Sequence, residues 1–432
     1  MKEFFKISEV ANILSVSKAT LRRWDSKGKL ISRRHPINNY RIYHRNDLKK
    51  LENFGFIFES HKETNVALVK PLKIYTSIEL FAGAGGLALG LEKSGLHCVL
   101  LNEIDKWACK TLKSNRPHWN VIEKDIKELD FTSFKGKVDI VTGGFPCQAF
   151  SYAGKQLGFE DARGTLFFEF ARCVKETKPA ICVGENVRGL VQHDGGKTLK
   201  GMISVLEDIG YKVLPPQILK AIHHRVPQKR ERLLIVGIRK DLDIPFEFPT
   251  PQKEIYTLKD ALKKGRLYPC PVPSSRGQIY PKRKKEILQL VPPGGYWRDL
   301  PVKIQKEYMQ GSFYLGGGKT GMARRISWDE PCLTLTCSPA QKQTERCHPD
   351  ETRPFTVREY ARIQTFPDDW QFEGSISQQY KQIGNAVPVH LAEEIGLSLV
   401  KALNNFYNPK IFNLFGEEII QKINNKNYHA SL

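Results

Sequence analysis

The sequence predicts an α/β fold with a doubly wound, Rossmann-like, mostly parallel sheet, and two observations carry this prediction. Short apolar, β-branched runs alternate with helical patterns from residue 74 to about residue 240, as in successive βαβ units. The first run enters the glycine-rich turn 81–86, where a backbone can approach a nucleotide-like cofactor closely. We therefore expect the functional groups along the carboxyl ends of the strands.

Each expected strand is a short apolar run, and several end in residues suited to chemistry. The predicted strands are 74–80, 98–103, 120–122, 138–141, 180–187 and a later one, 233–238. Their ends bring the glycine turn, Glu103, Asp125, Cys147 and Glu185 to one edge of the sheet. Glu103 stands about twenty residues after the glycines. At this spacing along the sequence, a carboxylate in such a fold accepts hydrogen bonds from ribose hydroxyls.

One cysteine stands on a constrained loop at this edge. The stretch Gly143-Gly144-Phe145-Pro146-Cys147 follows an apolar run, so the glycines release the backbone where the strand ends. Pro146 fixes its own φ and restricts the residue before it, which suits a rigidly held nucleophile. The alternative is that Cys147 is a small buried apolar side chain. Because Cys147 is expected at the same sheet edge as Glu103, Asp125 and Glu185, we favour its interpretation as a nucleophile.

The composition indicates an intracellular protein that binds nucleic acid. Lysine and arginine number 67 against 46 acidic residues, giving a net charge of +21, and such a balance favours a polyanionic ligand. The alternative is a generically soluble basic protein. No apolar run is long enough to span a bilayer, and the N-terminus lacks a signal-peptide pattern. We expect a cytoplasmic protein of a prokaryotic cell, without a membrane partner.

The nine cysteines predict reduced thiols and no metal site. Their number is odd, which disfavours a disulfide framework in a long chain without a secretion signal. Cys332, Cys337, Cys347 and His348 lie close in sequence. Their spacings match no zinc-binding pattern.

Residues 1–52 predict a separate winged helix-turn-helix domain. Helical patterns over 7–14 and 19–24 flank a short break, and hairpin-like runs over 30–34 and 40–43 precede a third helix at 47–51. This pattern resembles the DNA-binding module of MerR-type and excisionase-type proteins. Arg22, Arg23, Arg33 and Arg34 are then candidates for DNA contacts; the alternative is a solvated basic face. Residues 53–73 are predicted to form a linker.

The βα rhythm stops after about residue 240. Residues 241–351 are rich in proline, glycine and basic residues, which predicts a smaller, irregular domain that faces nucleic acid. A helix is expected over 356–363, and the stretch 384–388 opens another from Val389. The catalytic domain is therefore expected to combine 74–240 with 352–405, and 406–432 form a C-terminal tail.

Six motifs together resemble the DNA (cytosine-5) methyltransferases over roughly residues 74 to 405. They stand in that family's order at 81–86, 146–148, 185–187, 228–232, 353–359 and 384–388. Glu79 stands where the family usually has aspartate, a minor departure. The resemblance implies an S-adenosylmethionine site whose floor and walls are Phe81, Gly83, Ala84, Gly85, Glu103 on the ribose, Asp125 on the adenine amine, Ile126, Leu166 and Asn385.

The resemblance also implies a covalent mechanism on a flipped cytosine. Cys147 would add to C6, protonated Glu185 would donate to N3, and Arg230 and Arg232 would hold O2 and orient Glu185. A stacked base is out of reach, so it must leave the duplex. The residues implied to contact DNA are Gln148 and Ser151 on a loop closing over the base, and Gln228.

We therefore predict a DNA cytosine-5 methyltransferase of a restriction–modification system, acting as a monomer on double-stranded DNA, with a cognate endonuclease as a functional partner. Three alternatives stay open. The substrate could be tRNA, as in a closely similar family. The chain could be a DNA-binding regulator with an inactive methyltransferase fold. The N-terminal module could add repression of an operon to the enzyme activity.

Overall fold

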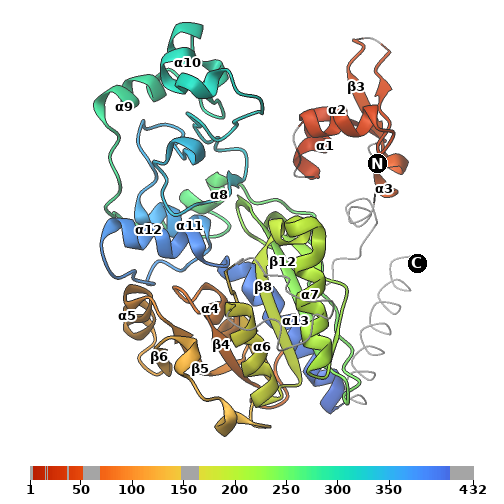
Figure 1. Ribbon diagram of the computed structural model, residues 1–432. Helices are drawn as coiled ribbons and strands as arrows, with labels where there is room; N and C mark the ends of the chain where they lie inside the picture. Colours follow the sequence, from red (N-terminus) through yellow and green to blue (C-terminus); the bar gives the residue numbers. More distant parts are fainter. Residues whose placement is uncertain are drawn as a thin grey trace, which may run out of the picture. The chain divides into compact units, whose positions relative to one another are not determined.

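The computed structural model describes residues 3–14, 16, 18–36, 38–51, 69–146 and 165–408. The chain divides into two compact units. One contains residues 1–68 with Thr250–Ile255, and the other contains residues 69–249 and 256–432. The colours of Figure 1 follow the chain from the first unit, in red, to the last helix, in blue. The two units are described separately.

The N-terminal unit combines short helices with a three-stranded antiparallel sheet of order β1-β3-β2. Its elements are β1 (Phe4–Lys6), α1 (Ile7–Ile13), α2 (Lys18–Ser26), β2 (Arg33–Arg34), β3 (Arg41–His44) and α3 (Arg45–Lys49). The expected helices and hairpin are confirmed. Strand β1 was not predicted, because three residues are too few to show a period. A core that includes Val10, Leu21 and Tyr43 holds the elements together.

Asp25 fixes the β2–β3 hairpin to helix α2. Its carboxylate accepts hydrogen bonds from the Ser32 backbone N–H at 2.9 Å and from the Ser32 hydroxyl at 2.7 Å, and it pairs with Arg41 at 2.8 Å. The hydrogen bonds from Arg41 and Ser32 outweigh the opposing effect of burial and lower the pKa of Asp25. The hairpin is thereby held at a fixed position relative to α2.

An eight-stranded sheet of order β10-β12-β8-β7-β4-β5-β6, with β9 beside β12, forms the centre of the larger unit. Strands β6, β5, β4, β7 and β8 run parallel, and β12 pairs antiparallel with β8, β9 and β10. The strands are β4 (Thr76–Leu80), β5 (His97–Glu103), β6 (Val121–Glu123), β7 (Ile140–Gly143), β8 (Ile181–Val187), β9 (Tyr211–Val213), β10 (Gln217–Lys220) and β12 (Glu231–Arg239). The predicted α/β fold class is confirmed.

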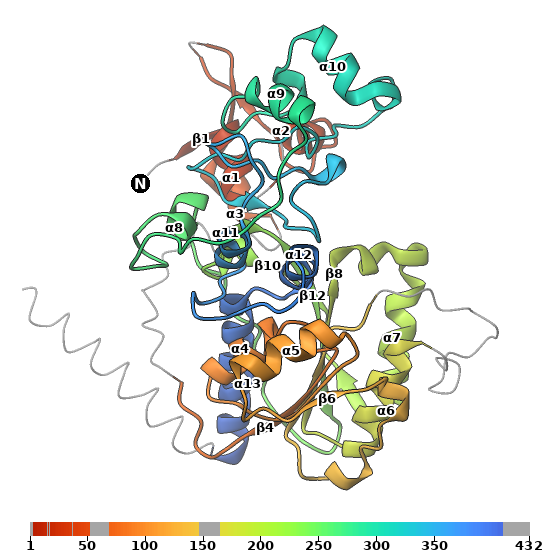
Figure 2. The same cartoon turned by 90° about the vertical axis from the view of Figure 1, so that its left-hand side faces the viewer.

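Helices cover both faces of this sheet (Figure 2). Successive side chains of a strand point to opposite faces: Ile140 packs with α4 and α13, whereas Val141 packs with α6 and α7. The helices are α4 (Gly86–Lys93), α5 (Lys106–Asn115), α6 (Leu166–Thr177), α7 (Lys197–Asp208) and α13 (Val389–Tyr407). The sheet is therefore doubly wound, as expected.

Helices α4 and α13 touch through glycines. A Cβ added at Gly90 would lie 2.3 Å from the Ala392 Cβ, and one at Gly86 would lie 2.2 Å from the Val387 carbonyl oxygen. Contacts this short leave no room for a side chain. The stretch 384–388, which opens α13, therefore folds back onto the glycine turn that opens α4, which agrees with the resemblance that places Asn385 at the same site as this turn.

The irregular stretch after residue 240 contains short helices around a core of its own. Helices α9 (Lys282–Gln289) and α10 (Val302–Met309) contribute Leu288 and Met309 to that core. Helix α8 (Leu258–Leu262) instead packs into the core of α11 (Val357–Ile363) and α12 (Ile376–Asn385). The remaining strands, β11 (Gln228–Lys229) and β13 (Cys332–Leu333), pair in parallel.

Candidate active site

The candidate site begins where strands β4 and β7 end side by side. In the parallel part of the sheet, β4 lies between β5 and β7, so the strand order reverses there, and open α/β sheets bind ligands outside such a switch point. After β4 the backbone takes positive φ values at Phe81 (58°), Gly83 (55°) and Gly85 (82°). Phe81 adopts an angle that is rare outside glycine. The turn is tightly constrained at this edge.

Glu103, at the end of β5, fixes the glycine turn. One oxygen, Oε2, accepts a hydrogen bond from the Gly83 backbone N–H at 2.7 Å, while Oε1 accepts from the backbone N–H groups of Ile104 and Asp105 at 2.8 Å each. A carboxylate oxygen has two lone pairs, so Oε2 keeps one for a further donor. Glu103 can hold one hydroxyl without releasing the turn.

The other residues expected at the cofactor have varied surroundings. Asp125 accepts a hydrogen bond from the Lys127 backbone at 3.0 Å. Ala84 and Ile126 are buried. Leu166, the first residue of α6, is half-buried. Asn385 is exposed at the end of α12 and accepts a hydrogen bond from the Cys337 thiol at 3.2 Å. The Gly86–Val387 approach brings the Asn385 segment beside the glycine turn.

Glu79, the departure from the family pattern, is buried in β4 with 1% of its surface exposed. Burial raises its pKa to about 8. Glu79 is therefore largely protonated at neutral pH and adds little charge beneath the glycine turn. A longer neutral side chain replaces the usual aspartate there.

The loop that leads to Cys147 is anchored up to Pro146. Phe145 is 2% exposed, and its ring packs edge-to-face on Phe167 at a centroid distance of 5.1 Å. The buried side-chain amide of Asn186 donates a hydrogen bond to the Phe145 carbonyl at 2.9 Å. Sequence reasoning did not assign Asn186 a role, although it stands beside Glu185 in one of the motifs. Cys147, Gln148 and Ser151 lie outside the described residues.

Glu185 and Arg232 form an ion pair next to this loop. Their Oε1 and Nε atoms are 2.5 Å apart, and each side chain is 12% exposed. Glu185 of β8 lies opposite Leu234 of β12. Residues two apart on a strand share a face, so Arg232 lies on the same face of β12 as Leu234, within reach of Glu185. A Cβ added at Gly144 would lie 3.0 Å from the other Glu185 oxygen. The carboxyl group is therefore held between Arg232 and the cysteine loop.

Arg230 is fully buried and binds backbone carbonyls. Its guanidinium donates to Leu335 at 3.2 Å and to Gly384 at 3.0 Å. Burial, together with the positive charge of Arg232, lowers the pKa of Arg230 to about 9. No hydrogen bond among the described residues joins Arg230 to Glu185. Arg232 is the arginine that orients Glu185, and Arg230 links β12 to the segments around Leu335 and Gly384.

Gln228, expected at the DNA, is completely buried. Its amide donates to the Gln364 side chain at 2.9 Å and accepts from the Leu335 backbone N–H at 2.9 Å. The parallel pairing of β11 with β13 places it there. Gln228 therefore joins the segments around Leu335 and Gln364 in this structure.

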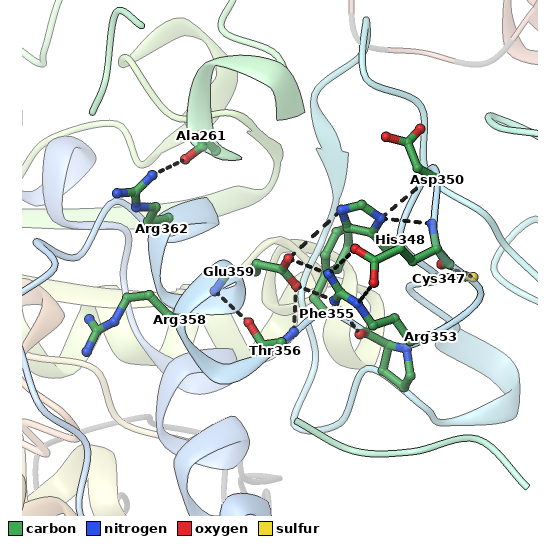
Figure 3. A network of polar contacts seen from close by, with 12 residues as sticks. Ala261, Cys347, His348, Asp350, Arg353, Phe355, Thr356, Arg358, Glu359 and Arg362 are labelled. Carbon is green, nitrogen blue, oxygen red and sulfur yellow. Dashed lines mark hydrogen bonds and ion pairs between the residues drawn. The ribbon is translucent and has the colours of Figure 1, made fainter. Parts of the chain in front are cut away.

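The motif at 353–359 forms a polar network (Figure 3). Arg353 makes two hydrogen bonds to Glu359, at 2.7 and 2.8 Å, and two to Glu351, both at 2.9 Å. Glu359 also closes a capping box with Thr356 at the start of α11. The Nδ1 atom of His348 accepts hydrogen bonds from the backbone N–H groups of Asp350 and Glu351. The network fixes the loop before α11.

The basic residues proposed at the N-terminal unit are exposed. Arg22 and Arg23 lie on helix α2 with exposed side chains.

Within the described ranges, no group of His, Cys, Asp or Glu could hold a metal ion. In the same residues, no helix has the length and apolarity to cross a membrane.

A constrained glycine turn at a switch point, beside the loop that ends at Pro146 and a paired carboxyl group, is typical of an α/β enzyme whose site lies at the carboxyl ends of the strands. Residues 75–401 match the family described as C-5 cytosine-specific DNA methylase, and the chain belongs to this family. Residues 6–43 match the family described as MerR family regulatory protein. The protein is a cytosine-5 DNA methyltransferase with a MerR-like N-terminal module, which confirms both resemblances.

Related proteins agree with this assignment. The type II methyltransferase M.Eco47II of Escherichia coli is 64% identical over 94% of this chain and 97% of its own length. The type II methyltransferase M.PspPI of Psychrobacter sp. (strain TA137) is 60% identical over 93% of this chain and 96% of its own. A solved structure of an E. coli prophage DNA modification methyltransferase aligns with a TM-score of 0.55 and 25% identity, over 76% of this chain and 99% of its own.

Replacing Asn186 with alanine should impair both stability and methyl transfer. The variant leaves the buried Phe145 carbonyl without its donor, which costs about 1–3 kcal/mol of unfolding free energy. The loop before Cys147 loses its anchor, and a misplacement of about 1 Å can lower kcat roughly 100-fold. Chemical denaturation and single-turnover methyl transfer would measure the two effects.

Asn404→Ala is the matched control. The Asn404 side chain is also buried and hydrogen-bonded, accepting from the Tyr75 hydroxyl at 2.7 Å and donating to the Lys70 carbonyl at 2.9 Å, but it lies near the end of α13. This variant should lose stability and keep the kcat of the folded enzyme. Equal losses of kcat in the two variants would contradict a positioning role for Asn186.

Proposed function

We propose that the protein transfers a methyl group from S-adenosylmethionine to C5 of a flipped cytosine in a specific sequence of duplex DNA. The observation that carries this proposal is the Glu185 carboxyl group, held between Arg232 and the loop that leads directly to Cys147. The relatives described as type II methyltransferases support a modification enzyme of a restriction–modification system. A cognate endonuclease would then be a functional partner.

The proposed chemistry uses the thiolate of Cys147 as the nucleophile. It forms a bond to C6 of cytosine while Glu185 donates a proton to N3, so that C5 becomes enamine-like. Arg232 holds Glu185 and faces O2 of the base. S-adenosylmethionine supplies an electrophilic methyl sulfonium. When C5 takes the methyl group, S-adenosylhomocysteine leaves. A base then removes the C5 proton, N3 returns its proton to Glu185, and the S–C6 bond breaks to release the Cys147 thiolate.

The residues at the switch point fit S-adenosylmethionine. The free lone pair of Glu103 Oε2 suits a ribose hydroxyl, and the glycine turn lets the backbone approach the ligand. We assign the cofactor contacts to Phe81, Gly83, Ala84, Gly85, Glu103, Asp125, Ile126, Leu166 and Asn385. Arg230 stabilises the site indirectly, because its hydrogen bond to the Gly384 carbonyl connects that segment to the strand that carries Arg232.

DNA recognition is assigned to three parts of the chain. Residues 241–351 form the target-recognition domain, between the catalytic segments 74–240 and 352–405. Gln148 and Ser151 belong to the loop that closes over the flipped base. The module 1–52, joined by the linker 53–73, adds phosphate contacts through Arg22 and Arg23; residues 406–432 remain a tail. We propose a monomer, because each flipped base needs one asymmetric site.

Bisulfite sequencing of plasmid DNA from cells that express the protein tests this function. Wild-type protein should protect cytosines in one fixed sequence context, and Cys147→Ser should protect none, because serine is not a thiolate nucleophile at neutral pH. If wild-type protein protects no plasmid cytosine but methylates purified tRNA, the substrate is RNA. Binding to a promoter without any methyl transfer would instead support an inactive regulator.

Replacing Arg22 and Arg23 together with glutamine should weaken duplex binding without changing the methylated sequence. Phosphate contacts carry no base information, and each one lost reduces the slope of log affinity against log salt by about 0.9. Titration of labelled duplexes at several salt concentrations measures both slope and sequence preference. Lys49→Gln combined with Lys50→Gln, at the end of helix α3, is the control of equal charge. A changed methylation context would refute a backbone-only role.

A further inference from the structure

A cavity of about 470 Å³ lies away from the cysteine loop, between the start of the α9 region and the loop before α11. Its volume falls in the range of ligand sites. The lining residues that carry the following argument are Arg276, Gln278, Lys285, Thr352, Arg353 and Thr356. Basic, hydroxyl and amide groups thus meet in one recess beside apolar side chains that include Ile279 and Ile376, and no acidic residue lines it.

The walls of the cavity are fixed by backbone contacts. Gly277 pairs with Thr356 across an isolated antiparallel bridge, and the Val357 backbone N–H donates to the Arg276 carbonyl at 2.9 Å. The Arg353 network holds the opposite wall (Figure 3). The recess is therefore formed before any ligand arrives.

The cations of this region divide into paired and unpaired groups. Arg353 is neutralised by Glu351 and Glu359. In contrast, Arg276 and Lys285 are exposed, and neither forms an ion pair with any residue that the structure describes. Two cations without an internal ion pair thus line the cavity.

Two neighbouring cations of helix α9 are already paired. Arg283 contacts Glu307 at 2.6 Å, and Lys284 contacts the buried Glu345 at 2.9 Å. Lys284 therefore has a structural role between α9 and the core of its domain. Lys282 and Lys285 of this helix form no ion pair with a described residue, and a cation that lacks an internal carboxylate gains fully from an external anion. Of these two, Lys285 is the one that lines the recess.

The cavity wall continues toward the candidate active site. The Gln278 side chain accepts a hydrogen bond from the Ser338 hydroxyl at 2.9 Å. Ser338 follows Cys337, whose thiol donates to Asn385 at 3.2 Å. Two polar contacts thus connect the recess to the segment that packs on the glycine turn. The recess and the candidate active site thus adjoin the same segment of the chain, residues 337–338.

We propose that this recess binds the phosphodiester backbone of the duplex whose cytosine is methylated, through Arg276 and Lys285. The proposal rests on the proposed function, since that function supplies the duplex. Phosphate contacts fix the position and orientation of a protein on DNA without reading bases. The recess thereby sets how the duplex lies while the target cytosine occupies the active site.

The test measures duplex binding against salt for wild-type protein, Arg276→Gln, Lys285→Gln and the double variant. Labelled duplexes with and without the methylated sequence are titrated from about 50 to about 200 mM salt. Each removed charge should reduce the slope of log affinity against log salt by about 0.9. Both duplexes should lose affinity by the same factor.

Two controls separate charge from structure. Lys212→Gln removes one charge from β9, which pairs with the end of β12 remote from Arg232, and should leave the slope unchanged. Arg276→Lys and Lys285→Arg keep the charge and should keep the wild-type slope. Thermal unfolding verifies that each variant is folded.

The outcomes distinguish this proposal from the proposed function. An unchanged slope in the folded double variant, or a loss of affinity for only one of the duplexes, overturns the recess as a phosphate site. Loss of slope in the charge-preserving variants overturns it as well. Binding needs no methyl transfer, so wild-type protein that binds duplex but never methylates it would contradict the proposed function alone.

Discussion

The site depends on one hydrogen bond between neighbouring strand ends, from the Asn186 amide to the Phe145 carbonyl. It joins the loop after β7 to the end of β8, where Gly143 and Gly184 already lie side by side. Because the Phe145 ring is packed against α6, the loop is held from two directions. The same strand end carries Glu185, so the carboxyl group and the approach to Cys147 share one rigid support.

The second constraint is the close packing of α4 on α13. Helices from opposite ends of the catalytic region meet through Gly86 and Gly90, where no side chain fits. This contact brings the Gly384 segment to the glycine turn, and Arg230 binds that segment from β12. Distant motifs are thereby joined into one site by packing and by a buried cation whose partners are backbone carbonyls.

Apolar periodicity and glycine turns are local signals, and they predicted the parallel strands and the helices on both faces of the sheet. The return of the last motif to the glycine turn was implied only by the family resemblance, through Asn385. The sequence could not separate the two arginines: Arg230 and Arg232 lie two residues apart, yet one binds carbonyls and the other Glu185. Gln228 was expected at the DNA but is buried in the pairing of β11 with β13. This burial could not be predicted, because β13 lies about a hundred residues further along the chain. Such long-range strand pairings produce no periodic pattern of apolar residues in the sequence.

Trapping the covalent intermediate would test the central claim, that Cys147 attacks the cytosine beside the Glu185–Arg232 pair. A duplex with 5-fluorocytosine at the methylated position has no C5 proton to remove, so the S–C6 bond cannot break after methyl transfer. Wild-type protein with S-adenosylmethionine should form a denaturant-stable complex with this duplex, and Cys147→Ser should form none. A stable complex with the serine variant, or none with active wild-type protein, would contradict the mechanism.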